Sequence, residues 1–351
     1  MGFFTEQELL SLRIDSMILH VVGDVEFEAQ NARPVEHQEF FLGRIRDTNA
    51  SPIFEFDPES STKKVIERIA SGAESFELGS QKLSREFAKE HDGTSKPGAF
   101  FVFQLSSNEP SARYFSLIKY DYQQAIEQSR GEAGNLLRLI VQAFVAQKKA
   151  VQKSALVRVL NGTADALMTA ADRISRGPDI ADYFAQFLHV KRTRSDAELN
   201  QRVRDVIRET LQEVRDLLPD RDVARAFSRA KATLRDRAFI DRDAISEAVI
   251  AASDAIGRED FVIDVGARLD RKMRSAKLDG LSFPPDRKVL CVPAKRKVTT
   301  AEGVTITYPD EADVNIVDRR ELPGGGEIIT IKTARVMEDV VVRETSKQAG
   351  R

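Results

Sequence analysis

Two aromatic-rich segments of strand length, joined by a turn cluster, constrain the fold of the first third of the chain most strongly. Gly98 to Leu105 (GAFFVFQL) and Tyr114 to Tyr120 (YFSLIKY) flank the segment Ser106 to Arg113 (SSNEPSAR), which is rich in turn-forming residues. Thirteen of the 20 Phe residues of the chain lie in residues 1–124. We therefore expect a β-hairpin here, within the best-packed sheet core of the protein.

The segments around this hairpin predict a mixture of strands and helices. Leu12 to Val22 is rich in Ile and Val and ends at a Gly-Asp turn, and Phe40 to Ile45 has a similar apolar character, so we expect both to be strands. Asn135 to Val145 has the apolar spacing of a helix. Ala155 to Leu160 is followed by Asn-Gly, which favours a strand that ends in a hairpin turn.

Beyond Pro178 the sequence changes to nearly pure helix. Four amphipathic segments with short links are expected to pack as antiparallel helices: Asp179 to Val190, Asp196 to Leu218, Asp222 to Ala238 and Asp243 to Ile256. A further helical stretch reaches Lys277, and short β-type runs then begin at Lys288 to Val292. The three glycines 324–326 lie before a β-type run, which favours a hairpin loop over a phosphate-binding turn.

The chain is therefore expected to have an α+β fold with three parts. These are a mixed α/β N-terminal domain (1–176), a central helical segment (177–256) and a small α+β C-terminal domain (257–351).

Charge is distributed unevenly along the chain, although the formal net charge is only −2. Residues 1–124 hold 13 basic and 20 acidic side chains, a net charge of −7. Residues 268–297 hold ten basic and three acidic side chains, a net charge of +7. Such a patch can bind a polyanion on a protein that is nearly neutral overall, and the acidic N-terminal domain could meet a protein partner.

Composition and motifs point away from several classes of protein. The single Cys291 excludes a disulfide framework within the chain, favours a cytoplasmic compartment, and lies in an apolar run where we expect a buried thiol. No apolar run is long enough to span a membrane. The chain has no P-loop, no GxGxxG turn and no G-x-S-x-G elbow, and its four His residues have no metal-ligand spacing. We therefore expect no enzyme, no metal and no cofactor. A nuclease whose carboxylates converge only in three dimensions stays open.

Clusters of Arg and Lys are the one positive functional signal, because these side chains contact phosphates. The first cluster, between helices, is Lys191, Arg192 and Arg194. The second recurs at i, i+4, i+8 and is Arg221, Arg225 and Arg229. The third cluster has the fewest acidic residues relative to its cations, and consists of Arg268, Arg271, Lys272, Arg274, Lys277, Arg287, Lys288, Lys295, Arg296 and Lys297. The alternative is that the helical cations belong to surfaces laced by salt bridges, because acidic residues are interleaved with them.

Several segments in sequence order resemble the bacterial 37-kDa nucleoid-associated protein family over roughly residues 10–340. They are IDSMILHVV, FFLGRIRD, the GAFFVFQL and RYFSLIKYDY hairpin and DIADYFAQFL, and the most specific are YFSLIKYDY and IADYFAQFL. In that family Lys153 and its surroundings would correspond to a basic strand start. The last third departs most, and only its Gly-rich loop and the ITIKT strand look familiar.

The resemblance implies DNA association in the bacterial nucleoid, with no catalytic residues to transfer. Together with the basic clusters it predicts a non-enzymatic, largely sequence-nonspecific binder of double-stranded DNA. A homodimer is expected, because duplicated weak patches raise avidity. The alternatives are a protein–protein scaffold or a DNA-sensing component of an anti-phage defence system, and the metal-dependent nuclease.

Overall fold

The computed structural model describes residues 2–23, 26–90, 97–121, 123–131, 134–143, 150–173, 178–218, 221–254, 259–292, 295–309 and 316–340. The fold is α+β, as the sequence predicted. Its internal contacts divide the chain into two compact units, with the division between Cys291 and Val292.

The first unit contains a large antiparallel sheet. Its strands lie in the order β1-β3-β4-β7-β9-β2-β10, with β8 paired to β7. Their bounds are Arg13–Val22 (β1), Phe54–Phe56 (β2), Gly98–Ser106 (β3), Ala112–Tyr120 (β4), Val151–Leu160 (β7), Thr163–Ala164 (β8), Leu167–Asp172 (β9) and Val190–Arg192 (β10). The predicted aromatic hairpin is confirmed, with Phe103 opposite Ser116. The predicted Asn-Gly turn is also confirmed, because Asn161 and Gly162 take φ of 50° and 83° between β7 and β8.

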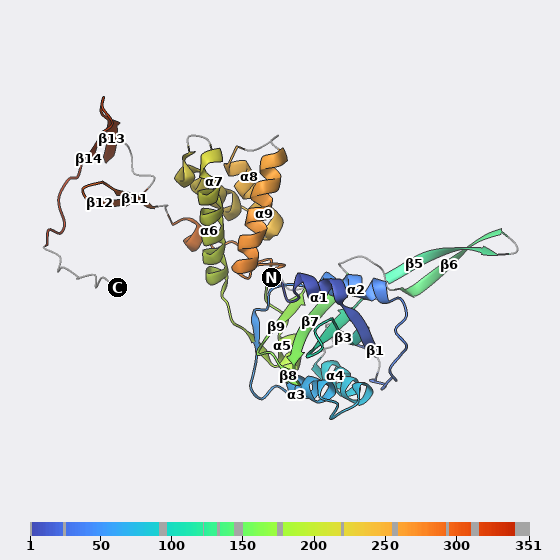
Figure 1. Cartoon of the computed structure of the whole chain (residues 1–351). Helices are drawn as coiled ribbons and strands as arrows, with labels where there is room; N and C mark the ends of the chain where they lie inside the picture. Colours follow the sequence, from blue (N-terminus) through green and yellow to red (C-terminus); the bar gives the residue numbers. More distant parts are fainter. Residues whose placement is uncertain are drawn as a thin grey trace. The chain divides into compact units, whose positions relative to one another are not determined.

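Helices cover both faces of this sheet (Figure 1). On one face lie α1 (Glu6–Ser11) and α2 (Gln38–Arg46), and the Phe41 ring contacts Phe101 and Phe103. On the other face lie α3 (Ser61–Ala70), α4 (Phe76–Glu90) and α5 (Asp182–Leu188), where Phe87 stacks on Phe100 with ring centroids 4.1 Å apart. The phenylalanines of residues 1–124 thus build a core on both faces of the sheet.

Two predictions of secondary structure in the N-terminal part are wrong. Phe40 to Ile45 is not a strand but lies in α2, because Phe41, Leu42 and Ile45 form one buried face of a helical turn. Asn135 to Ala143 is not a helix but lies in β6 (Gly134–Ala143), which pairs with β5 (Gln123–Gly131) in a two-stranded sheet of its own. A short apolar run is compatible with the period of a helix and with that of a strand. The contacts that decide between the two come from residues outside the run itself. Phe144 and Val145 lie outside the described residues.

The helical part of the first unit contains five helices among the described residues after β10. They are α6 (Asp196–Glu213), α7 (Val223–Arg235), α8 (Arg242–Ala252), α9 (Glu259–Ser275) and α10 (Arg287–Leu290), with a 3-10 helix at Arg215–Leu217. A capping box of Ser195 and Glu198 starts α6. Helix α9 packs against α6 and α8, so residues beyond the predicted boundary at 256/257 pack with the helical segment.

The segment around Cys291 differs from its prediction. Residues 288–290 lie in α10 rather than in a strand, because Asp286 caps the N-terminus of that helix through the N–H groups of Lys288 and Val289. Leu290 is buried, whereas Cys291 is exposed, so the expectation of a buried thiol is wrong. A single helical turn places only one residue of this apolar run in the core.

The described part of the second unit contains two hairpins. In the first, β11 (Lys295–Thr299) pairs with β12 (Thr305–Pro309); in the second, β13 (Val317–Glu321) pairs with β14 (Glu327–Ile331). Gly324 and Gly325 take φ of 131° and 91° between β13 and β14, which confirms the predicted hairpin loop. No helix in the described ranges is both long and apolar enough to cross a bilayer.

Candidate nucleic-acid interface

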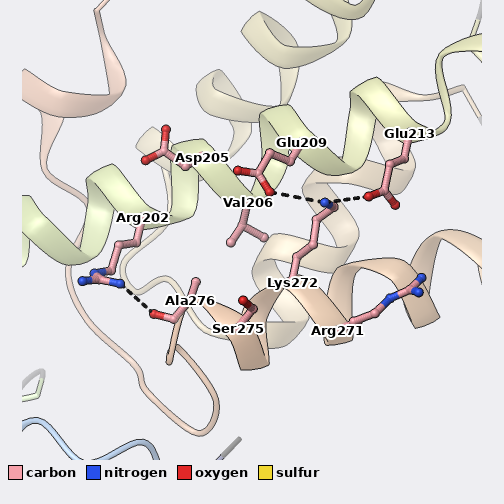
Figure 2. A pocket seen from close by; sticks show the side chains of 9 residues that line it. All are labelled: Arg202, Asp205, Val206, Glu209, Glu213, Arg271, Lys272, Ser275 and Ala276. Carbon is pink, nitrogen blue, oxygen red and sulfur yellow. Dashed lines mark hydrogen bonds and ion pairs between the residues drawn. The ribbon is translucent and has the colours of Figure 1, made fainter. Parts of the chain in front are cut away.

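Part of the third basic cluster is engaged in ion pairs between α9 and α6. Lys272 Nζ lies 2.7 Å from Glu213 Oε1 and 3.3 Å from Glu209 Oε2 (Figure 2). The hydrogen bond from Lys272 lowers the pKa of Glu213, and that same bond raises the pKa of Lys272. Arg268 binds Asp264 at 3.0 Å and lies 3.9 Å from Glu213. These two cations therefore hold the helices of the bundle together.

A cavity of about 410 Å³ lies along this seam. Three cations (Arg202, Arg271, Lys272) and three carboxylates (Asp205, Glu209, Glu213) line it, so it carries no net charge. Figure 2 shows the Arg271 side chain diverging from that of Lys272, and its positive charge helps to lower the pKa of Glu213. Arg271 is exposed and forms no ion pair with the described residues, so it is the cation of this seam that can meet an external anion.

Arg194 binds the C-terminal end of α9 instead of pointing freely into solvent. Its Nη1 donates to the carbonyl oxygen of Lys277 at 3.0 Å, and Nη1 of Arg202 donates to that of Ala276 at 3.2 Å. Both carbonyl oxygens directly follow the end of α9, and cations are favoured at the C-terminal end of a helix. Burial lowers the pKa of Arg194. Arg274 binds Glu6 of α1 at 2.6 Å, so this cation links the bundle to the N-terminal domain.

The first basic cluster contains one paired and one unpaired residue beside Arg194. Arg192 forms ion pairs with Asp196 and, at 2.9 Å, with Asp179, and its side chain is 14% exposed. Lys191, in β10, is exposed and has no carboxylate partner in the described part of the chain. Only Lys191 of this pair is available to a phosphate.

The second cluster is similarly divided. Arg221 lies 3.6 Å from Asp216 and takes a φ of 52°, so it precedes α7 rather than continuing its face. Arg229 lies 3.3 Å from Asp254. Arg225 is exposed and has no carboxylate partner among residues with a described position. The predicted alternative of a helix surface laced by salt bridges therefore describes two of the three arginines.

The least neutralised basic segment is 287–297. Arg287 and Lys288 are exposed in α10 and line an open depression of about 400 Å³ together with Asp196, Pro284, Pro285 and Asp286. No acidic residue occurs between Asp286 and Glu302. Neither Arg287 nor Lys288 forms an ion pair with the described residues, so both keep their charge for an external partner.

The β11–β12 hairpin carries three consecutive cations opposite uncharged residues. Lys295, Arg296 and Lys297 lie opposite Pro309, Tyr308 and Thr307. Lys297 is exposed; the side chains of Lys295 and Arg296 lie outside the described ones. The other hairpin contrasts with this, because Arg319 binds Glu327 through two hydrogen bonds of 2.5 and 2.8 Å and Arg320 binds Asp318 at 2.9 Å.

Sequence reasoning missed that acidic residues of α6 form ion pairs with the basic residues of α9. Glu209 and Glu213 are four apart on α6, and Arg268 and Lys272 are four apart on α9. Two such complementary i, i+4 pairs are the signal that could have predicted the seam. Among the described residues, no three His, Cys, Asp or Glu side chains are grouped so that they could hold a metal ion.

No protein-family model matches this chain, and no curated protein matches it.

Proposed function

We propose that this protein is a non-enzymatic, largely sequence-nonspecific DNA-binding protein of the bacterial nucleoid. The observation that carries the proposal is the β11–β12 hairpin, whose three consecutive cations face no acidic cross-strand partner. A two-stranded ribbon that carries consecutive cations opposite uncharged residues suits the contacts to phosphate oxygens that position a protein on a duplex. The resemblance of the N-terminal segments to the 37-kDa nucleoid-associated family points in the same direction.

The proposal assigns phosphate contacts to those of the predicted cations that the fold does not already use. Those that form no ion pair with the described residues are Lys191, Arg225, Arg271, Lys277, Arg287, Lys288 and Lys297. Lys295 and Arg296 join them by their position in β11. Arg192, Arg194, Arg268, Lys272 and Arg274 hold the fold, and we assign them no direct role in binding.

A gel-shift titration with two unrelated duplexes tests the proposal. Both duplexes should bind with similar affinity at 50 mM salt and much more weakly at 200 mM, because binding to phosphates releases counterions. The variant K295E/R296E/K297E should weaken binding to both. If its three native cations all contact phosphates, their loss lowers the slope of log K against log salt by about 2.7.

The control variant is R319A/R320A on the neighbouring hairpin, where both arginines are already paired. It should bind DNA as the unchanged protein does. Absence of DNA binding at 50 mM salt would refute the proposal and favour the scaffold alternative. Nicking of supercoiled plasmid in Mg²⁺ or Mn²⁺ would refute its non-enzymatic part.

The proposal includes a homodimer, in which two β11–β12 hairpins would bind one duplex. Light scattering coupled to gel filtration measures this directly. A mass of one chain, 39.3 kDa, at concentrations at which the gel shift is complete would exclude the dimer.

A further inference from the structure

A second cavity, of about 600 Å³, lies within the first unit between the N-terminal sheet and the helical part. Its volume falls in the range of about 300–1,000 Å³ that is usual for small-molecule sites. Residues from the end of α2, from β7 and β9, and from the loops at 239 and 280–282 line it. It does not include the residues to which we assign DNA contacts.

Backbone contacts fix the walls of this cavity. The Ser51 N–H donates to the carbonyl oxygen of Asp279 at 2.8 Å. A Cβ on Gly280 would lie 2.8 Å from the Ala50 Cα, so these two loops touch through their main chains. An antiparallel bridge between Ile240 and Phe283 holds the neighbouring Phe239 and Ser282, which both line the cavity. The walls are therefore built by tertiary contacts rather than by loose loops.

Arg173 is a cation of this wall with no carboxylate bound to it in the described ranges. Its N–H donates to the carbonyl oxygen of Gln152 at 2.9 Å, which anchors the backbone. Burial lowers its pKa, and Asp47 offsets part of that effect. Asp47 itself binds Arg44 at 3.0 Å. The two carboxylates of the lining, Asp47 and Asp172, are paired with Arg44 and Lys153. The guanidinium of Arg173 is exposed, and its planar set of donors can bind a phosphate through two hydrogen bonds.

The remaining lining groups suit a planar heterocycle. Phe239 is 38% exposed, so part of its ring is free to contact a base. Asn49 accepts the Phe4 N–H at 2.9 Å through Oδ1, which leaves its amide N–H groups as donors. The lining thus offers amide donors and an aromatic surface, two of the features by which nucleobases are recognised.

We propose that this cavity binds a nucleotide, with its phosphate at Arg173 and its base against Phe239. The nucleotide could be a free mononucleotide or the 5′-phosphorylated end of a DNA strand, because both present the same groups. The proposal is independent of the phosphate contacts of the β11–β12 hairpin.

Isothermal titration calorimetry of the full chain with AMP, GMP, CMP and UMP tests the site. At least one of them should bind with a Kd below about 1 mM. Its nucleoside, which lacks the phosphate, should bind at least tenfold more weakly, as should inorganic phosphate. Failure of all four nucleotides, or phosphate binding as tightly as a nucleotide, would overturn the proposal.

Variants locate the binding in the cavity. R173A should lower the affinity for the nucleotide at least tenfold, and R173K should lower it less because the positive charge remains. F239A should weaken nucleotide and nucleoside alike. The matched control is R215A, because Arg215 is an exposed arginine that does not line this cavity. Unchanged nucleotide affinity in R173A, with circular dichroism like that of the unchanged protein, would overturn the proposal.

Competition separates the two sources of the nucleotide. Displacement of the bound mononucleotide by 5′-phosphorylated dT₈, but not by unphosphorylated dT₈, assigns strand ends; displacement by neither assigns free nucleotides. The variant K295E/R296E/K297E should keep its affinity for the mononucleotide while it loses duplex DNA, so failure of one proposal can be told from failure of the other.

Discussion

Lys272 of α9 and Glu213 of α6 form an ion pair of 2.7 Å. The basic 268–297 segment therefore contains cations that stabilise the fold as well as cations that form no such pair. The side chain of the preceding residue, Arg271, diverges from that of Lys272 (Figure 2) and forms no ion pair with the described residues. Two neighbouring cations in one helix therefore have different roles, because successive residues of a helix point in directions about 100° apart.

Replacement of these two neighbours should separate stability from DNA binding. K272A should lower the free energy of unfolding by about 0.5–1 kcal/mol, because the two carboxylate partners are partly exposed and screened by water. R271A should leave stability unchanged and weaken DNA binding at 50 mM salt. Urea denaturation and gel shift measure the two effects. The reverse pattern, with DNA binding lost in K272A alone, would contradict the assignment.

His20 should make stability depend on pH in the acidic range. Its side chain is fully buried, its Nε2 accepts the Gln30 N–H at 3.1 Å, and burial together with the charges of Arg85 and Arg33 lowers its pKa from 6.5 to about 4. The folded protein therefore binds fewer protons than the unfolded chain between pH 6.5 and 4. The stabilisation is complete above pH 6.5 and decreases as the pH falls towards 4, by up to about 3 kcal/mol.

Urea denaturation at intervals between pH 7 and pH 4 measures this dependence. The variant H20Q keeps a hydrogen-bond acceptor but does not titrate. The slope of its unfolding free energy against pH should therefore be smaller, over this range, by the contribution of one proton. An equal slope in both proteins would contradict the assignment to His20.

The buried ion pair of Lys153 and Asp172 should be sensitive to removal of one partner. Lys153 Nζ lies 2.6 Å from Asp172 Oδ2, and the two side chains are 2% and 0% exposed. The Lys153 ammonium also lies 4.8 Å from the centre of the Tyr183 ring. D172A should lower the free energy of unfolding by about 3–5 kcal/mol, because it leaves a buried charge without its anion. The double variant K153M/D172L should be much less destabilised. A cost for D172A below that of the double variant would contradict this account.

Two glycines provide a matched pair for the wall of the nucleotide cavity. G280A should destabilise the protein by about 1–3 kcal/mol, since the new Cβ would lie 2.8 Å from the backbone of residues 49 and 50, at a φ of 67°. G266A, in α9, meets no atom within 4 Å and should instead stabilise the helix by up to about 1 kcal/mol. Thermal denaturation compares the two. Equal Tm values in both variants would show that the loops at 50 and 280 do not touch as described.

The sequence by itself determined the elements whose signals are local. The aromatic hairpin, the Asn161-Gly162 turn and the α6 helix were all predicted, because a turn residue acts on its own neighbours and an amphipathic helix repeats its apolar period along the sequence. The α+β class followed from the same patterns.

Only the tertiary structure decided the elements and the roles that depend on distant partners. Gly134 to Ala143 is a strand because β5 pairs with it, and Phe40 to Ile45 is a helix because its apolar face packs on the sheet. The basic clusters looked alike in sequence, yet Arg194 binds a carbonyl of Lys277, 83 residues away, whereas Lys297 stays exposed. Whether a cation is free depends on which carboxylates and carbonyls the fold brings within hydrogen-bond distance, and net charge along the sequence does not contain that information.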